Sequence, residues 1–253
     1  TTLFRSPVVL NMSDTLFRMA GERQDERMQA VAIATQLDYY YFQGTNEDSV
    51  IHYTNKVKEF AKATHQPKYY YFAWANRLIT YYLKTSRTNI ALYEVQNMLK
   101  EAQEEDDKTG LSRCYNIMSQ IYTIKRFDSM AFEWRLKEIE LTEKYKIENY
   151  NISQTYAQIA NYYINQKKQK EALAAVEKAI ATANSSTQQI SAKLEFVNYY
   201  SKFGDFQAAE KLLKECQAAF EQDKRLESIK KRLYNIECLY YQQTKQYQKD
   251  RKS

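Results

Sequence analysis

Glycine and proline are scarce, since the chain of 253 residues contains four glycines and two prolines. Average proteins use about 7% glycine and about 5% proline, largely where the backbone turns. Gly44, Pro67, Gly110 and Gly204 fall between segments of helical periodicity, so we expect each of them in a connection. Helix-forming residues fill most other positions. The composition therefore predicts an all-α protein with short connections.

Residues that usually carry catalysis or bind metals are also few. The two histidines, His52 and His65, are too far apart to form the i, i+4 pair that binds a metal from one helix. The cysteines Cys114, Cys216 and Cys238 include no CxxC pair, and neither a glycine-rich phosphate loop nor a GxSxG motif occurs. We therefore predict no enzyme activity, no cofactor and no metal site for this segment.

Neither sign of charge dominates the chain. Lys and Arg number 37 against 31 for Asp and Glu, which gives a formal net charge of +6. The basic clusters at 167–170 and 230–232 are short, and we interpret them as solvated helix faces rather than a direct nucleic-acid site. No apolar run approaches the 18 residues or more that suggest a membrane helix, so no membrane span is predicted.

The chain does contain an internal repeat of about 40 residues. An aromatic anchor recurs at Phe42, Tyr82, Tyr122, Tyr163 and Tyr200, and a small or apolar residue follows nine positions later, at Ile51, Ala91, Ala131, Ala172 and Ala209. A short connection lies between the two positions each time. Such a period is typical of a solenoid built from helix pairs.

The repeat predicts where the helix pairs begin. We expect residues 1–23 to form an N-terminal segment with a capping helix, and residues 24–253 to form five full pairs and the first helix of a sixth. The five pairs are predicted to begin near Gln24, Pro67, Asp107, Tyr150 and Ser186.

Residues 156–184 show the pattern of one repeat most clearly. Ile159, Ala160 and Tyr163 share one stripe of the first helix, and Ala172, Val176 and Ala179 share one stripe of the second. This order of large, small and aromatic residues followed by Ala, an apolar residue and Ala resembles the tetratricopeptide repeat. The resemblance implies a right-handed superhelical solenoid of antiparallel helix pairs.

The second helices of the first and third repeats depart from this pattern. Asn55 and Arg135 stand where an apolar residue is expected. A shift of one residue restores an apolar stripe through Val50, Thr54 and Val57 in the first repeat, and through Met130, Trp134 and Leu141 in the third. The sequence leaves the register of both helices open.

Adjacent aromatic residues occur in "LDYYYFQG" (37–44) and "KYYYFAW" (68–74). Neighbouring positions on a helix point about 100° apart, so several faces of each helix must accept an aromatic ring. In a solenoid, we expect Tyr39 and Phe42 to face the packed layers and Tyr40 to face the concave surface. Packing explains such tyrosines, and an aromatic cage for a ligand at Tyr40 is the alternative.

The repeat family implies a binding surface along the concave faces of the first helices. Counting from the anchors gives two rows, one with Gln36, Asn76, Asn116, Ala157 and Leu194, and one with Tyr40, Thr80, Gln120, Asn161 and Asn198. Amides in such rows can bind the backbone of an extended peptide, and Lys84 and Arg113 could add charge for a carboxylate. We therefore predict a peptide or protein segment as the partner. The alternative is that these side chains bind no partner and only solvate an exposed face of the helices.

A second resemblance concerns the setting of the repeats. The tyrosine-rich repeats, with "DSVIHY", "DSMAFEW" and "YNISQTYAQIANYY", resemble the tetratricopeptide regions of sensor proteins of the Bacteroidetes. This resemblance implies a periplasmic sensor region before a transmembrane helix and a histidine kinase or DNA-binding output domain. The alternative is a cytosolic scaffold or a peptide-responsive transcriptional regulator. The open reading frame on both sides of the segment discriminates between them.

The C-terminal residues resemble the start of a sixth pair, with Tyr241 at the anchor position. We expect its apolar stripe through Leu233, Ile236 and Tyr240 to be partly bare. The sequence therefore predicts that the solenoid continues, and that the isolated segment either forms a homodimer through this end or frays after about Gln242.

Overall fold

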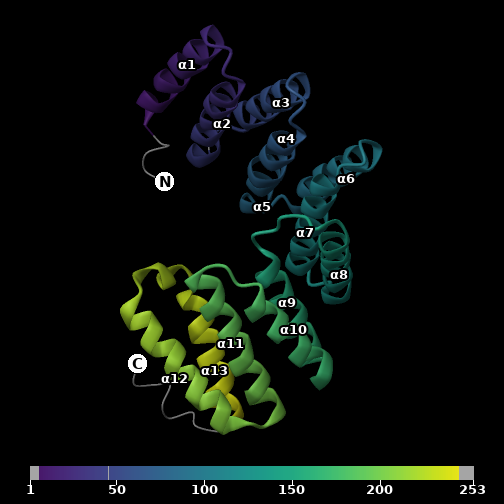
Figure 1. The fold of residues 1–253 in the computed structure, drawn as a ribbon, viewed down its shortest axis with the longest axis vertical. Coiled ribbons are helices and arrows are strands. Elements are labelled where there is room, and N and C mark those ends of the chain that lie inside the picture. The colour runs from purple at the N-terminus through teal and green to yellow at the C-terminus, as the bar shows by residue number, and fades with distance from the viewer. Residues whose placement is uncertain (1–5, 45, 245–253) are drawn as a thin grey trace. The chain divides into compact units, whose positions relative to one another are not determined.

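Helices form every regular element in the computed structural model of the protein, which describes residues 6–44 and 46–244 (Figure 1). No strand occurs in those two ranges, which confirms the prediction of an all-α fold. The chain divides into two compact units, Thr1–Leu141 and Thr142–Ser253, and each is described by itself. None of the helices in the described ranges combines the length and the apolar character that a membrane span requires.

The first unit begins with α1 (Pro7–Glu22), and successive helix pairs follow it (Figure 1). They are α2 (Glu26–Gln43) with α3 (Glu47–Ala63), a segmented helix with α6 (Thr88–Glu104), and α7 (Lys108–Ile124) with α8 (Asp128–Tyr145). The segmented helix comprises α4 (Pro67–Ala73), the π-helical segment η2 (Trp74–Ile79) and α5 (Thr80–Lys84). These first helices start within two residues of the predicted positions, and α8 ends in the second unit.

Most connections between the helices share one turn. A residue just beyond the helix end has a positive φ, namely Gln24, Gly44, His65, Ser86, Asp106, Arg126, Lys146, Lys167 and Gly204. A left-handed residue there lets the following N–H donate back to a carbonyl inside the helix. In this way the carbonyls of the predicted anchors Tyr82, Tyr122, Tyr163 and Tyr200 accept bonds from Arg87, Phe127, Lys168 and Asp205. Glycine is scarce because residues with side chains make most of these turns.

Gly110 does not lie in a connection, as the sequence had suggested, but in the first turn of α7. Its N–H donates to Oδ1 of Asp107 over 2.7 Å. A Cβ at this position would lie 3.0 Å from the ring of Tyr71 and 3.1 Å from the Cβ of Ala102. The glycine therefore permits close packing of α7 against its neighbours. Pro67 is the first residue of α4, a position where the helix needs no backbone donor.

The second helices of the first unit resolve the register question in two different ways. In α3 the shifted stripe is confirmed, because Val50, Thr54 and Val57 are buried. In α8 the shifted stripe is confirmed only in part, because Trp134 and Leu141 are partly buried and pack against the core. Met130 is exposed, whereas Arg135 is buried on the original stripe and donates from Nη2 to Thr123 Oγ1 over 2.7 Å. A buried charged residue can occupy an apolar position when its polar groups find partners.

The adjacent aromatic residues of the first unit do point in different directions. Tyr70 and Tyr71 are buried in the core, while the next residue, Phe72, is 43% exposed. In the earlier run Tyr41 is the buried ring. Tyr40 stacks on the ring of Tyr53 in α3, with the two ring centroids 5.2 Å apart. Packing between helices therefore explains most of these rings.

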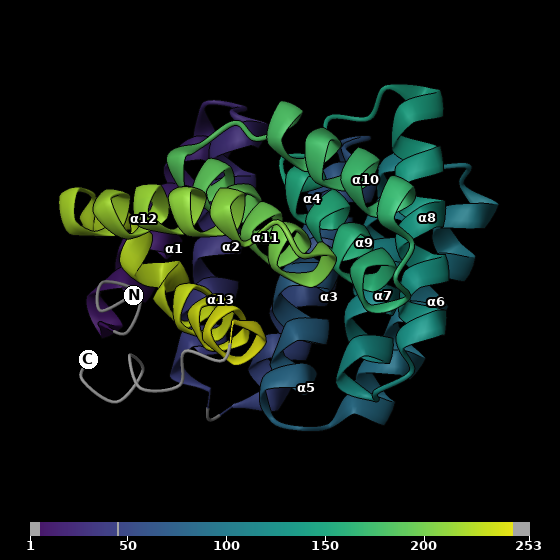
Figure 2. The same ribbon diagram turned by 90° about the horizontal axis from the view of Figure 1, so that it is seen from below.

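The second unit contains two more helix pairs and a last helix. They are α9 (Ile152–Asn165) with α10 (Gln169–Ala181), α11 (Ser186–Phe203) with α12 (Phe206–Gln222), and then the 3₁₀ turn η3 (Lys224–Ile229) and α13 (Lys230–Gln243). Helix α11 packs against α9, α10, α12 and α13 (Figures 1 and 2). The first helices α9, α11 and α13 therefore form a layer with α11 in the middle.

The apolar stripe of α13 is not bare, which corrects the sequence-based expectation. Leu233, Ile236 and Tyr240 are buried, and they share a core with Leu213 of α12 and Leu194 of α11. This stripe therefore offers no surface for a homodimer. The fraying predicted beyond α13 concerns residues 245–253, which lie outside the described residues.

Candidate binding surface

In the first repeat, the predicted binding residues lie at the junction of three helices rather than on a free face. Gln36 is buried, and its amide donates to Asp14 of α1 while its carbonyl oxygen accepts from Lys56 of α3. Tyr40 is half-buried against Tyr53. Gln36 joins α1, α2 and α3, and Tyr40 joins α2 to α3, so neither side chain is available to a ligand without breaking these contacts.

In the third repeat, one predicted amide holds a buried charge. Glu138 of α8 is 1% exposed, and both of its carboxylate oxygens accept from Asn116 Nδ2 over 3.2 Å. The Oδ1 atom of Asn116 accepts from Gln120 Nε2 over 2.6 Å. Asn116 therefore stabilises its own helix pair, and the exposed Gln120 presents its remaining polar atoms to solvent.

The first helix of the second repeat presents a different surface. Phe72 and Lys84 are exposed, and Asn76 and Thr80 between them are half-buried. The π-helical segment changes the spacing here, because a π turn brings residues i and i+5 together. The hydroxyl of Thr80 accordingly donates to the carbonyl of Ala75 over 2.9 Å. The amide side chain of Asn76 makes no hydrogen bond within the described part of the chain.

Cationic side chains surround the exposed ring of Phe72. The guanidinium carbon of Arg77, five residues further along the π turn, lies 5.6 Å from the ring centroid, and that of Arg113 from α7 lies 5.5 Å away. Such distances are typical of cation–π contacts. Lys84 lies 4.2 Å over the ring of Tyr41. Phe72, Asn76, Arg77, Lys84 and Arg113 are called the Phe72 surface below.

The two arginines of the Phe72 surface differ in their counter-ions. Arg77 forms two hydrogen bonds to the carboxylate of Asp38 in α2. Arg113 has no ion pair with any described residue, and its Nε atom is buried without a hydrogen-bond partner. Burial lowers the pKa of Arg113, and the attraction of the Asp107 carboxylate opposes this shift only in part. Burying a cation costs free energy unless a carboxylate pairs with it, so Arg113 is a favourable site for a carboxylate from outside the fold.

In the second unit, a polar network crosses the layer of first helices. Glu195 of α11 is 4% exposed and accepts from Arg232 of α13 over 2.5 Å. Its second oxygen accepts from Asn198 over 3.4 Å and from Asn161 of α9 over 3.5 Å. The two predicted amides therefore meet, but they meet at a carboxylate of the protein itself.

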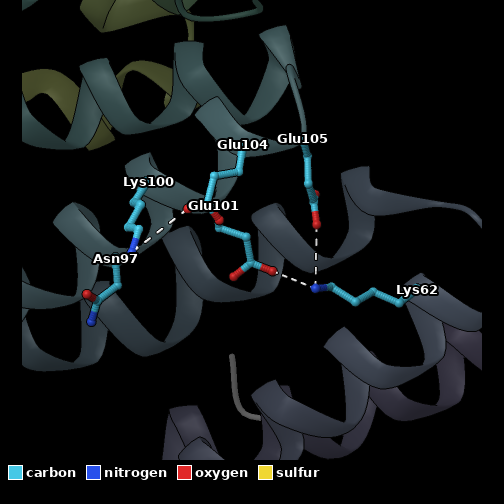
Figure 3. A pocket seen from close by; sticks show the side chains of 6 residues that line it. All are labelled: Lys62, Asn97, Lys100, Glu101, Glu104 and Glu105. Carbon is cyan, nitrogen blue, oxygen red and sulfur yellow. Dashed lines mark ion pairs between the residues drawn. The ribbon is translucent and has the colours of Figure 1, made fainter.

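A pocket of about 340 Å³ lies between α3 and α6 (Figure 3). It is lined by Lys62, Asn97, Lys100, Glu101, Glu104 and Glu105. The amine of Lys62 reaches 2.7 Å from Glu101 and 3.5 Å from Glu105, as the dashed lines in Figure 3 show. The charged groups of the pocket therefore bind one another.

Two tyrosines of α4 also bind the carboxylates of this network. Tyr70 donates to Glu101 over 3.1 Å, and Tyr71 donates to Glu105 over 2.8 Å. Burial and the neighbouring carboxylates raise the pKa of both phenols, which remain protonated donors. The network joins α3, α4 and α6, and we assign it to packing of the first two repeats rather than to a ligand.

Among the described residues no group of three or more His, Cys, Asp and Glu side chains could hold a metal ion. Of the residues predicted to bind, Asn76, Lys84 and Arg113 belong to the Phe72 surface, whereas Phe72 and Arg77 were not among the predicted residues. A signal existed for Arg77, because an acidic residue, Asp38, precedes it by about one repeat.

These elements define an all-helical, repeat-like protein. No protein-family model matches the chain, and the search of curated proteins gives no match. Among solved structures, the chain is similar to the crystal structure of BtubC (BKLC) from P. vanneervenii, with a TM-score of 0.66. The similarity covers 84% of this chain and 91% of BtubC at 14% sequence identity, so it concerns the fold alone.

Proposed function

We propose that the chain is a non-catalytic repeat domain, a tetratricopeptide-like solenoid, that binds a peptide or protein segment along its first helices. The observation that carries the proposal is the Phe72 surface. An exposed ring, an amide without an internal hydrogen bond and cationic groups lie together there. A peptide needs such a mixture, because its backbone requires polar partners and its side chains require apolar ones.

The other predicted amides contribute less to this proposal. Gln36, Asn116, Asn161 and Asn198 already bind protein groups, so a peptide would have to displace those groups first. Recognition in the first unit therefore falls to Asn76 and the Phe72 ring, together with the polar atoms that Thr80 and Gln120 do not use within the fold.

The test uses three fluorescein-labelled dodecapeptides with blocked ends, one acidic, one neutral and one basic, each with a central aromatic residue. Binding to the full chain is followed by fluorescence anisotropy. The double variant Asn76→Ala/Gln120→Ala removes two peptide hydrogen bonds, each worth about 0.5–1.5 kcal/mol, so affinity should fall about 5- to 150-fold.

Asn97→Ala is the matched control, because Asn97 is a half-buried amide on α6, the second helix of the same repeat. It should leave the affinity unchanged. The proposal is wrong if none of the three peptides binds the wild-type chain, or if both variants bind as the wild type does.

We further propose that this domain acts as the extracytoplasmic sensor region of a signalling protein. The support is the resemblance of its tyrosine-rich repeats to sensor regions of the Bacteroidetes. The flanking reading frame tests this placement independently of peptide binding.

A further inference from the structure

Arginine–carboxylate pairs join successive repeats of this protein. Arg77 binds Asp38, 39 residues earlier in the chain. Arg87 binds Glu47, 40 residues earlier, over 2.6 Å. Arg232 binds Glu195, 37 residues earlier, over 2.5 Å. In each case a cation of one repeat is neutralised by the repeat before it.

Arg113 occupies the same place in its repeat as Arg232. Both stand nine residues before an aromatic anchor, Tyr122 and Tyr241 respectively. The partner of Arg232, Glu195, stands five residues before its own anchor. In the repeat before Arg113, that place is occupied by Arg77. The place that holds Glu195, the partner of Arg232, therefore holds the arginine Arg77 in the repeat before Arg113.

The surroundings of Arg113 agree with this missing partner. It has no ion pair within the described residues, and the nearby Asp107 instead caps α7 through Gly110. Arg232 also leaves its Nε without a partner, but its Nη2 reaches Glu195. Arg113 and Arg77 both lie near the exposed ring of Phe72, and Lys84 adds an exposed amine without an ion pair in the described chain.

We propose that the Phe72 surface binds an acidic peptide segment, with a side-chain carboxylate on Arg113 and a neighbouring apolar side chain on Phe72. The inference rests on the proposed peptide-binding function and adds the chemistry of the peptide. The carboxylate of the peptide would be the partner of Arg113, as Glu195 is the partner of Arg232 in the second unit. A guanidinium favours such a partner because it donates two parallel bonds to a carboxylate. The exposed ring offers the adjoining side chain an apolar contact.

The experiment compares four labelled dodecapeptides on the full chain by fluorescence anisotropy. The first has blocked ends and a central Phe-Glu, the second has Gln in place of that Glu, and the third has Ser in place of the Phe. The fourth is the Gln peptide with a free C-terminus. Hydrogen bonds to charged groups are worth about 1.5–3 kcal/mol, so the Glu peptide should bind at least about tenfold more tightly than the Gln peptide. The Ser peptide should bind more weakly than the Phe-Glu peptide.

Arg113→Met should reduce the preference for Glu over Gln to about twofold or less, with hydrogen bonds to the guanidinium lost. Arg23→Met is the matched control, since Arg23 is exposed at the end of α1 in the same unit, and it should keep the full preference. Because Arg113 has no ion pair with any residue that the structure describes, its replacement should not lower the melting temperature. Lys84→Met, at an exposed position, provides a second variant and should weaken binding of the Glu peptide about threefold through loss of charge.

The inference is overturned if the Glu and Gln peptides bind equally to the wild type, which leaves peptide binding itself intact. It is also overturned if Arg113→Met retains the preference, or if the free C-terminus of the fourth peptide restores full affinity. Failure of all four peptides to bind would instead contradict the proposed function.

Discussion

Glu195 offers the sharpest test of how the second unit is held together. Its carboxylate is buried in α11, accepts from Arg232 of α13 over 2.5 Å, and accepts more distantly from Asn161 and Asn198. Removing one partner of a buried ion pair leaves an uncompensated charge, which costs about 3–5 kcal/mol. We therefore expect Glu195→Leu and Arg232→Met each to lower the free energy of unfolding by about that amount.

The double variant Glu195→Leu/Arg232→Met should behave differently from the sum of the single variants. Replacing both charges by apolar residues removes the cost of burying them and is often neutral or stabilising by about 1–4 kcal/mol. Urea unfolding followed by circular dichroism gives the free energies. Hydrogen exchange of α13 locates the loss, since the two compact units need not unfold in one transition.

An exposed pair in the same unit supplies the control. Glu227 and Lys230 lie 3.2 Å apart with side chains that are 70% and 42% exposed. Exposed pairs contribute about 0–1 kcal/mol, so Glu227→Leu should change stability little. The reasoning is refuted if Glu195→Leu costs less than about 1 kcal/mol, or if the effects of the two single variants simply add.

Two further predictions concern the first unit. Burial favours a raised pKa for Glu101, but hydrogen bonds from Lys58 and Lys62 outweigh it and lower the pKa. A carboxyl whose pKa is lowered in the folded state stabilises the fold at pH values above its unfolded pKa of about 4.3, and this stabilisation is lost as the pH falls through the folded pKa. The melting temperature of Glu101→Gln should therefore fall less on acidification than that of the wild type. Gly110→Ala should destabilise by about 1–3 kcal/mol in urea, because the new Cβ meets the buried Tyr71 ring at 3.0 Å, and a neutral result would contradict this packing.

The repeat could be predicted from the sequence because its signals are local. An anchor such as Tyr82 accepts a bond from a residue five positions later, so the spacing from helix to turn is visible in any one repeat. The start of α11 at Ser186 could also be predicted, because it depends on residues that are close in the sequence. Helix caps and turns depend on neighbouring residues, so their signals recur in the sequence with the period of the repeat and can be recognised without knowledge of distant contacts.

The register of α8 could not be predicted by the same means. The shifted apolar stripe begins at Met130, which is exposed, whereas the structure buries the charged residues Arg135 and Glu138. These charges are tolerated because Thr123 and Asn116, which are remote in sequence, supply hydrogen bonds to them. Periodicity treats a charged residue as a surface residue, whereas the cost of burial depends on partners that only the fold brings together.

The candidate surface was only partly visible in the sequence for a related reason. Asn76 and Asn116 occupy corresponding places in their repeats, six residues before the anchors Tyr82 and Tyr122, so they could not be distinguished from the sequence. The fold separates them, because Asn116 meets the buried Glu138 whereas the side chain of Asn76 has no hydrogen bond within the described chain. A row of equivalent positions therefore does not make a row of equivalent sites.

The adjacent aromatics of "KYYYFAW" connect these observations. Tyr70 and Tyr71 are buried, and their hydroxyls donate hydrogen bonds to Glu101 of α6 and to Glu105 at the end of α6. Those carboxylates in turn bind Lys62 of α3, so two neighbouring phenols help to join three helices. Phe72 follows directly and has no hydroxyl with which to extend the network. Its ring is exposed, and the guanidinium groups of Arg77 and Arg113 lie within cation–π distance of it, so this helix joins the interhelical network on one side and presents an apolar ring with two cations on another.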